Sequence, residues 1–522
     1  MKRIMLMSAI ALAGCLPQQD EIEEALNTDP TTEEQLDDPQ ENNATPTVQN
    51  PTPLDLRLST LIDQQNLNRH PQRDLPNIAE PLPQLGKKLF FTKGLGGEFD
   101  SACVTCHHPA LGGGDNLSLP VGVDALSEDL LGPGRVHSSG LPPVPRNAPT
   151  VFNIGLWDRG LFHDSRVETL NFVPGSNGAN GSIRTPDSTL NSADSNAGNN
   201  LTAAQARFPV TSAEEMRGEI FEQGNGNDAI RNHLAARIGN YGEGAGELGS
   251  NDWLTEFQQA YGSNDSAENL ITFDNIANAI AEYERSMVFV NHPWQQYMDG
   301  DLNAMSEQAK QGAVLFFSHP EDGGAGCAGC HSGELFSDEQ HHVVAFPQIG
   351  PGKGDGTFGD DDFGRERETG SATDRYRFRT ASLLNIELTA PYGHTGSYET
   401  LRDVVRHYVN PARSVQDYFR RTEVCDLEQF ENRNDCANLY PNALANSQAA
   451  VNKLQQEQNN RTSRLPRIRL NDTQVNQLVS FLQALTDECA ADRNCLADWI
   501  PDADEAADQH QLNAIDDNGN TL

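Results

Sequence analysis

The sequence Cys103-Val104-Thr105-Cys106-His107 decides the interpretation of this chain, and its pattern recurs as Cys327-Ala328-Gly329-Cys330-His331. A Cys-x-x-Cys-His run is typical of covalent c-type haem attachment, in which both thiols join the porphyrin and the adjacent histidine binds its iron. With 9 Cys and 14 His in 522 residues, chance gives only about 0.004 such matches per chain. A zinc ribbon also uses four cysteines, but the His after each pair and the long gap between the pairs argue against it. The sequence therefore predicts two haems, attached to Cys103 and Cys106 and to Cys327 and Cys330, with His107 and His331 as axial iron ligands.

The N-terminus has the features of a secretory signal. Basic residues precede a largely apolar run from Ile4 to Ala13, which is too short to span a membrane in the mature protein. The run ends in Leu-Ala-Gly-Cys at residues 12–15, which resembles a lipoprotein box. We therefore expect residues 1–15 to be a signal peptide with lipidated Cys15; an ordinary signal with an unmodified cysteine is the alternative. Leu16 favours the periplasmic face of the outer membrane, or the cell surface, with the lipid as the only membrane anchor.

The formal net charge is −38, from 75 acidic and 37 basic residues. This balance argues against nucleic acid binding and favours solubility or docking of a basic partner. Between Gln18 and Thr60 lie eleven acidic residues and one arginine, among Pro, Asn, Gln and Thr. Such a segment buries too little apolar surface to fold, so we expect residues 16–68 to be a disordered acidic tether. Residues 499–522 are expected to be an acidic tail of the same kind.

Four cysteines remain once Cys15 and the haem motifs are set aside. Exported proteins meet an oxidising compartment, so two disulfides are expected, with free buried thiols as the alternative. Sequence alone leaves all three pairings open. The four residues are Cys425, Cys436, Cys489 and Cys495.

An internal repeat divides the body of the chain. The stretch GKKLFF at residues 86–91 precedes the first motif, and GAVLFF at residues 312–317 precedes the second. Two further pairs of stretches match, namely residues 146–154 with 379–386 and residues 162–170 with 393–401. Each half therefore contains a helix, a haem motif, a polar loop and a second helix.

Apolar residues at helical spacing predict the closing helix of each half. They recur from Ile276 to Val288 in the first half and from Val475 to Leu485 in the second. The Gly- and Asn-rich stretches 174–200 and 350–364 are expected to be loops. The second loop carries four aspartates that could bind a cation, although a solvated acidic loop is the simpler interpretation. These are Asp355, Asp360, Asp361 and Asp362.

From about residue 80 to residue 410 the chain resembles the bacterial di-haem cytochrome c peroxidases and their relative MauG, which oxidises tryptophans in a partner protein. Besides both haem motifs, the resemblance is carried by GGGD at 112–115, RNAPT at 146–150 and LTAPYGHTG at 388–396. It implies a mainly α fold of two cytochrome c-like domains with long loops, each carrying one covalent haem. The expected domains are residues 69–288, with the peroxidatic haem, and residues 289–498, with the electron-transfer haem.

The resemblance also implies a catalytic carboxyl. PVTSAEEM at residues 209–216 matches the segment on the far side of the peroxidatic haem, so Glu215 would be the acid–base and Met216 would lie near the haem. Cleavage of peroxide requires a proton to move from one oxygen to the other, and one positioned carboxyl can perform both transfers, contributing ~10²–10⁴-fold. From the residues alone, paired glutamates at the start of a surface helix would be the simpler interpretation.

The chain departs from many peroxidases of this family at two iron ligands. Where they have a histidine that caps the first iron, this chain has Val123, so the far side of that haem is expected to be open, with His137 as the alternative ligand. A high-potential cytochrome c haem usually takes methionine opposite its histidine, but no methionine follows the second motif. The resemblance places Tyr408 there, as in MauG, and a tyrosinate would stabilise oxidised iron. His407 is the rival ligand, and Tyr408 as an interface aromatic is the alternative.

Other residues match positions around the haems. The family's tryptophan between the haems aligns with His163, which leaves that bridge in doubt; Trp157 lies nearby in the sequence. His394 matches a histidine beside the second haem, and both histidines could instead bind haem propionates. A calcium ion held by one Asn side chain and two backbone carbonyls is also implied, and the matching residues are Asn147, Thr389 and Pro391.

These predictions favour a lipid-anchored di-haem peroxidase. Hydrogen peroxide would react at the N-terminal haem, and the C-terminal haem would relay electrons from a small redox protein, a cytochrome c or a cupredoxin. The alternative within enzymes is MauG-like, peroxide-dependent oxidation of aromatic residues in a partner protein. A di-haem electron carrier, with both irons bound on both faces, is the alternative from another class.

Overall fold

The computed structural model describes residues 50–65, 67, 73–503 and 505–522, and these are mainly helical with little strand, as predicted. The helices are α1 (Pro53–Gln65), α2 (Pro81–Phe91), α3 (Leu201–Gln205), α4 (Asn227–Gly239), α5 (Trp253–Tyr261), α6 (Ala267–Leu270), α7 (Phe273–Ser286), α8 (Pro293–Met298), α9 (Glu307–Phe317), α10 (Glu366–Thr369), α11 (Leu401–Val409), α12 (Pro411–Arg420), α13 (Ala443–Asn459), α14 (Asp472–Gln483) and α15 (Glu488–Ala491). The strands are β1 (Gly160–Leu161), β2 (Val167–Thr169), β3 (Ile183–Arg184), β4 (His341–His342) and β5 (Phe378–Arg379). The first three form an antiparallel sheet in the order β1-β2-β3, and β4 pairs antiparallel with β5, His341 opposite Arg379.

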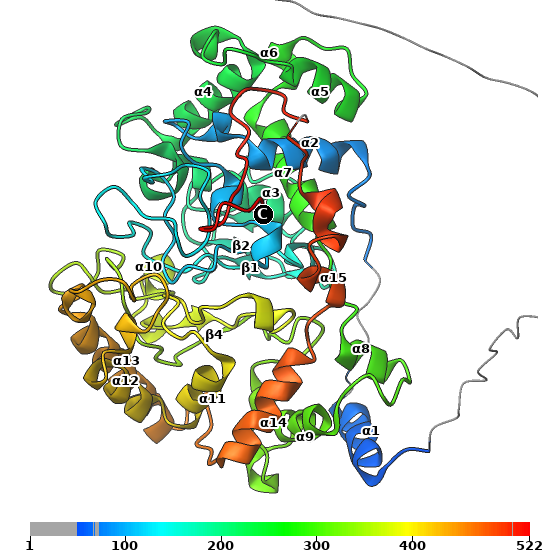
Figure 1. Ribbon diagram of the computed structural model, residues 1–522, viewed down its shortest axis with the longest axis vertical. Helices are drawn as coiled ribbons and strands as arrows, with labels where there is room; N and C mark the ends of the chain where they lie inside the picture. The colour runs from blue at the N-terminus through cyan, green and yellow to red at the C-terminus, as the bar shows by residue number, and fades with distance from the viewer. Residues whose placement is uncertain (1–49, 66, 68–72, 504) are drawn as a thin grey trace, which may run out of the picture. The chain divides into compact units, whose positions relative to one another are not determined.

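A crossing of two helices lies at the centre of each half: α2 packs against α7, and α9 packs against α14 (Figure 1). The predicted closing helices are thereby confirmed as α7 and α14. At each crossing stands the glycine that begins the repeated stretch. A Cβ on Gly86 would lie 1.9 Å from the Ala279 carbonyl oxygen, and one on Gly312 would lie 1.9 Å from that of Gln477. Only glycine lets two backbones approach so closely, which explains its place in the repeat.

The hydrophobic cores exchange segments between the halves. The core around α9 and α14 includes residues of the first half between Ile154 and Phe208. Conversely, the core around α2 and α7 includes residues from the C-terminal end of the chain. These are Ala490, Leu496, Ala507, Leu512 and Ala514. The predicted boundary at 288/289 therefore separates the two helix pairs but not the two cores.

The C-terminal end is packed, which corrects the expectation of a disordered tail over residues 499–522. In Figure 1 it runs, in red, over the blue and green first half. Asp508 is buried and accepts hydrogen bonds from Thr92 Oγ1 at 2.9 Å and from Trp253 Nε1 at 2.7 Å. Leu512, also buried, donates its backbone N–H to the Phe91 carbonyl at 2.8 Å. A few buried residues hold the tail in place, and they could not be recognised from its acidic composition.

A second correction concerns α1, which lies inside the range predicted as a disordered tether. This helix packs beside α9 (Figure 1). Leu58 is fully buried on its inner face, and the Asp55 carboxylate forms an ion pair with Lys310 Nζ at 2.7 Å and accepts from the Tyr297 hydroxyl at 2.9 Å. The signal peptide, Cys15 and the rest of the tether as far as residue 49 lie outside the described residues.

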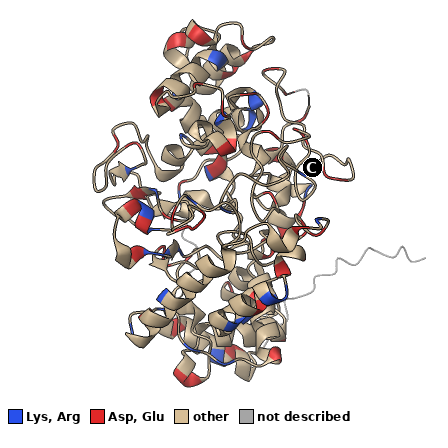
Figure 2. Cartoon of the chain, turned by 90° about the vertical axis from the view of Figure 1, so that its left-hand side faces the viewer, with Lys and Arg blue, Asp and Glu red and all other residues tan. Residues whose placement is uncertain are grey.

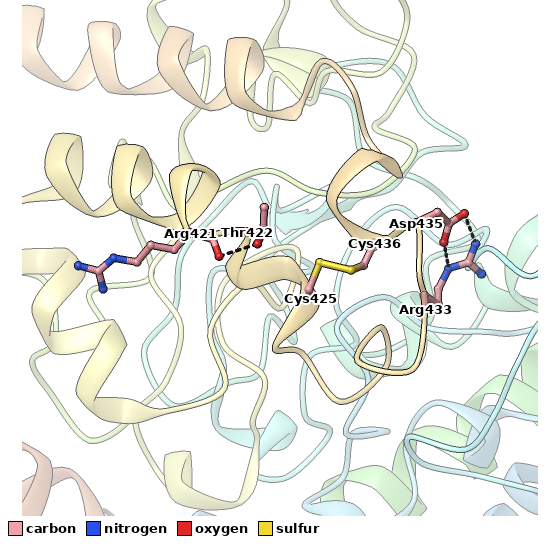
Figure 3. The surroundings of a disulfide bond; sticks show 6 residues. All are labelled: Arg421, Thr422, Cys425, Arg433, Asp435 and Cys436. Carbon is pink, nitrogen blue, oxygen red and sulfur yellow. Dashed lines mark hydrogen bonds and ion pairs between the residues drawn. A yellow bond between two sulfur atoms is a disulfide. The ribbon is translucent and has the colours of Figure 1, made fainter.

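Both expected disulfides are present, and the structure resolves their pairing. Cys425 is bonded to Cys436, and Cys489 to Cys495. Figure 3 shows the first of these, close to the ion pair between Arg433 and Asp435, whose atoms are 3.0 Å apart. The four cysteines of the haem motifs form no disulfide. Among the described helices, none has the length and apolar character needed to cross a membrane.

Replacing Asp55 with alanine is expected to destabilise the protein by about 3–5 kcal/mol, because Lys310 would be left as a buried charge without its partner. Burial alone would raise the pKa of Asp55, but the hydrogen bonds from Lys310, Thr52 and Tyr297 outweigh it and hold that pKa well below its usual range. Urea unfolding of the Asp55→Ala variant measures this. The exposed Asp63 on the same helix provides the control, Asp63→Ala, with an expected change within about 0.5 kcal/mol. Equal free energies of unfolding for the Asp55→Ala and Asp63→Ala variants would contradict the packing of α1 against the core.

Candidate active site

One cavity is lined by both haem motifs, so the fold brings together residues from the two halves. Apart from Cys15, which lies outside the described residues, every predicted site residue lines it. They are Cys103, Cys106, His107, Asn147, His163, Glu215, Met216, Cys327, Cys330, His331, Thr389, Pro391, His394 and Tyr408. Trp157 also lines this cavity.

The two motif histidines are oriented in the same way. His107 donates its Nδ1–H to the Gly113 carbonyl at 3.2 Å, and His331 donates its Nδ1–H to the Phe336 carbonyl at 2.9 Å. A hydrogen bond at Nδ1 fixes the tautomer and leaves the Nε2 lone pair for a metal. Each motif begins as a short 3₁₀ turn, Cys103–Thr105 and Cys327–Gly329, and its thiols line the cavity.

The cavity wall contains buried polar atoms without partners. Arg379 Nη1 and His394 Nε2 form no hydrogen bond within the part of the chain that the structure describes. Arg379 stacks on Trp157 at 3.5 Å, and burial lowers the pKa of Arg379 to about 10, which still leaves it charged near neutral pH. Buried donors require acceptors, and a buried cation requires an anion. Haem propionates meet both needs, so the motif cysteines, the oriented histidines and these buried polar groups together fit two c-type haems.

Glu215 lies in a π turn, Ala213–Arg217, and not at the start of a surface helix as the alternative had it. In this turn the backbone N–H groups of Met216 and Arg217 both donate to the Ser212 carbonyl, at 3.2 and 2.9 Å. Such turns are rare and frequent at functional sites. The turn carries Glu215 into the cavity wall, while its neighbour Glu214 is exposed.

The loop after the first motif packs directly on this turn. A Cβ on Gly122 would lie 2.3 Å from the backbone oxygen of Glu215 and 2.5 Å from that of Glu214. Real Cβ atoms do not come so close, so any side chain here would displace the turn. Val123, the next residue, is buried. Its side chain has no atom that could bind iron. His137 is partly buried, bonds Ser139 through Nδ1 at 2.8 Å and does not line the cavity, which argues against it as a ligand.

Opposing effects set the protonation of Glu215. Burial raises its pKa, Arg166 and Lys353 lower it, and Glu214 raises it further, with a net rise above the ordinary value. Arg166 comes from the first half and Lys353 from the loop 350–364 of the second, and both line the cavity. A carboxyl whose pKa is raised toward neutrality is suited to both accepting and releasing a proton.

The loop that supplies Lys353 is exposed at its tip and buried at its second end, so the expected solvated loop is present only in part. Asp361 and Asp362 are buried, and each of its four aspartates accepts a hydrogen bond from a protein group. Arg146 holds the loop in place: it binds Asp362 through Nε at 2.6 Å and Nη2 at 2.8 Å, and Asp164 through Nη1 at 2.6 Å. The loop is therefore fastened to the first half by a buried arginine.

The geometry distinguishes the two candidate ligands on α11. His407 is fully buried, donates Nε2–H to the Val344 carbonyl at 2.8 Å and accepts at Nδ1 from the Tyr398 hydroxyl at 3.1 Å. Both of its nitrogens are occupied, and it does not line the cavity. Tyr408 lines the cavity with the second motif, and its hydroxyl has no hydrogen-bond partner among the described residues. Burial raises the pKa of the Tyr408 hydroxyl above its ordinary value.

The residues matched to a calcium site also form a group. Asn147 donates its amide to the Leu117 carbonyl at 2.7 Å, and its backbone oxygen accepts from His163 Nε2 at 2.9 Å. The Asn147 side-chain oxygen and the carbonyls of Thr389 and Pro391 accept no hydrogen bond from the described residues. Free oxygen acceptors are the donor type that calcium requires.

Four cavity residues were missed by sequence reasoning, namely Arg166, Arg379, Lys353 and Glu284. Arg379 begins the stretch that repeats the one begun by Arg146, so the repeat itself was a usable signal. Glu284 on α7 is buried, burial raises its pKa to about 8, and its Oε2 has no hydrogen-bond partner in the described part of the chain. Neither Lys353 nor Glu284 stands out in the sequence.

Comparison with known proteins agrees with this geometry. Residues 80–303 match the sequence model of a family described as di-haem cytochrome c peroxidase. The cytochrome c551 peroxidase of Pseudomonas aeruginosa is 28% identical over 332 residues, which cover 63% of this chain and 71% of that protein. The methylamine utilization protein MauG of Methylorubrum extorquens is 27% identical over 325 residues, covering 62% of this chain and 67% of that protein. The crystal structure of a MauG-like protein associated with microbial copper homeostasis shares the fold, with a TM-score of 0.51 and 21% identity over 82% of this chain and 98% of that one.

Replacing Gly122 with alanine is expected to move the π turn and to slow the reaction with peroxide by up to the ~10²–10⁴-fold that a positioned acid–base contributes. Stopped-flow absorbance of the haem-loaded protein measures the rate, and the haem content should be unchanged. Gly114→Ala is the control, because a Cβ there would lie 3.7 Å from the nearest atoms. Rates within about 3-fold of each other for the two variants would show that Gly122 does not position Glu215.

Proposed function

Because this chain belongs to the di-haem cytochrome c peroxidase and MauG family, we propose that it reduces hydrogen peroxide at an N-terminal haem, with electrons relayed through a C-terminal haem. The observation that carries this proposal is the single cavity in which Glu215 and both motif histidines meet. Bound haems supply the redox chemistry, through irons that exchange electrons with peroxide and with each other. Each haem belongs to one cytochrome c-like half, attached through Cys103 and Cys106 or through Cys327 and Cys330.

Glu215 moves the proton. Its carboxylate accepts the proton of the peroxide oxygen nearer to His107 and returns it to the other oxygen, which leaves as water. Arg166 and Lys353 favour the carboxylate before the transfer, while burial favours the acid afterwards. Gly122 leaves room for the backbone of the turn, so that Glu215 keeps its position.

Tyr408 would bind the iron of the C-terminal haem in this proposal. Its place in the cavity wall, with no hydrogen-bond partner among the described residues, supports this role, and the engaged nitrogens of His407 argue against the rival. A calcium ion held by Asn147, Thr389 and Pro391 belongs to the same proposal, supported by their free oxygen acceptors. The proposal also includes a lipid anchor at Cys15, a location at the periplasmic face of the outer membrane, and a small redox protein as the electron donor.

A MauG-like activity, oxidation of aromatic residues in a partner protein, is the second candidate. Two features favour it: Val123 leaves no capping ligand on the first iron, and a tyrosinate at Tyr408 would stabilise oxidised states of the second. A resting electron paramagnetic resonance spectrum tests both candidates against a pure electron carrier. The enzymes require a high-spin ferric signal from the N-terminal haem, and its absence would contradict both.

Glu215→Gln is expected to slow peroxide-driven oxidation of a reduced small cytochrome by ~10²–10⁴-fold, because the amide cannot carry the proton. Glu214→Gln is the matched control, since this exposed neighbour lies in the same turn. Turnover would be compared at saturating cytochrome, with haem content checked by absorbance. If both variants keep the wild-type rate, Glu215 is not the acid–base.

Tyr408→Phe is expected to change the spectrum of the low-spin haem, because the phenolate oxygen is removed from the iron. Tyr398→Phe provides the control: this buried tyrosine bonds His407 and Ser414 and does not line the cavity. Electron paramagnetic resonance and visible spectra of the oxidised proteins give the comparison. An unaltered low-spin signal in Tyr408→Phe would exclude it as the ligand.

A further inference from the structure

The connection between α13 and α14 concentrates positive charge in an acidic protein. It reads Arg461-Thr462-Ser463-Arg464-Leu465-Pro466-Arg467-Ile468-Arg469-Leu470, and we call it the arginine strap. It contains four arginines and no acidic residue, although acidic residues outnumber basic ones by 75 to 37 in the whole chain. Figure 2 shows that acidic residues are spread over helices and loops throughout the view. The strap therefore has the opposite sign to the chain as a whole.

The strap has two chemically different faces. Arg461, Arg464, Arg467 and Arg469 are all exposed. The apolar residues between them are partly buried and line the cavity shared by the haem motifs; these are Leu465, Pro466, Ile468 and Leu470. Pro466 lies against the start of the second motif, since its Cγ is 3.7 Å from the position of a Cβ on Gly326. Arg464 lines this cavity as well, so the strap borders the cavity beside the second motif and presents Arg461, Arg467 and Arg469 on its exposed side.

Within the described part of the chain, no carboxylate forms an ion pair with the four arginines of the strap. Arg467 bonds only the neutral side chains of Gln458 and Asn459, at 3.5 and 3.1 Å. Exposed arginines on the neighbouring helix behave differently. Arg413 and Arg420 on α12 both pair with Asp417, at 3.4 and 2.5 Å. The strap keeps its charges uncompensated where carboxylates are abundant, as expected of a surface whose counter-charge comes from another molecule.

We infer that the arginine strap is the docking surface for the acidic face of a small redox protein, which exchanges electrons with the haem on Cys327 and Cys330. This inference rests on the proposed function. Reduction of one peroxide to two waters consumes two electrons and two protons, so a one-electron carrier must dock twice in each turnover. Complementary charge speeds such encounters, and the strap is local, so it decides the sign of the partner more directly than the net charge of −38 does. The partner is therefore acidic at its contact face, in contrast to the basic partner that the net charge favours.

Charge reversal on the strap tests this inference. The variant is Arg467→Glu/Arg469→Glu, and the control is Arg57→Glu/Arg493→Glu, a pair of exposed arginines in α1 and after α15 with the same change in net charge. The probes are an acidic and a basic small c-type cytochrome, whose dissociation constants are measured with the haem-loaded protein at low and high salt. We expect the wild type to bind the acidic probe more tightly, and strap reversal to weaken that binding about 10–100-fold at low salt. The effect should shrink at high salt, and the control should stay within about 2-fold of the wild type.

A conservative variant guards against simple damage to the strap. Arg467→Lys/Arg469→Lys keeps the charge and should retain binding of the acidic probe within about 3-fold. The inference would be overturned if the strap reversal and the control weakened binding of the acidic probe equally. It would also be overturned if the wild type bound the basic probe more tightly and the strap reversal left that binding unchanged. Loss of binding to vesicles of anionic lipid without loss of cytochrome binding would overturn it too, since that result would assign the strap to a membrane surface. Peroxide consumption with a small artificial reductant is scored separately: its absence in the wild type would refute the proposed function, whereas the dissociation constants would still decide the docking surface.

Discussion

The buried contact of Arg146 with Asp362 and Asp164 holds the site together. It fastens a loop of the second half to the first half, with oxygen–nitrogen distances of 2.6 to 2.8 Å. All three side chains are almost completely buried, so each charge depends on the others for compensation. Burial alone would lower the pKa of Arg146, but the two carboxylates outweigh it and raise that pKa well above its usual range. Because the same loop carries Lys353 to the wall that holds Glu215, the chemistry assigned to the first half depends on a residue of the second.

This chain contains two similar frames, which differ in the groups that they bring to the cavity. Both frames use a glycine at the helix crossing and a histidine fixed through Nδ1. The first frame then adds the π turn with Glu215, supported by Gly122, while the second adds α11 with Tyr408. One frame thus presents a carboxyl to the shared cavity, and the other presents a phenol to it.

Features with a fixed spacing could be predicted from the sequence. The haem motifs, the repeat and the closing helices α7 and α14 depend on local patterns, and the structure contains them. The existence of two disulfides could also be predicted, from four remaining cysteines in an exported protein. Their pairing could not, because it depends on which segments meet in the fold. Errors arose where composition was averaged: α1 and the C-terminal end are polar overall, yet Leu58 and Asp508 are buried. Lys353 could not be found, because its importance depends on a loop placed by Arg146, far away in the sequence.

The contact of Asp508 with Thr92 and Trp253 imposes an order on maturation. A ribosome makes Trp253 255 residues before Asp508. Until the segment with Asp508 emerges, the hydroxyl of Thr92 and the indole N–H of Trp253 lack their acceptor, and the core around α2 and α7 lacks Leu512 and Ala514. The half that is synthesised first is therefore the last to complete its core.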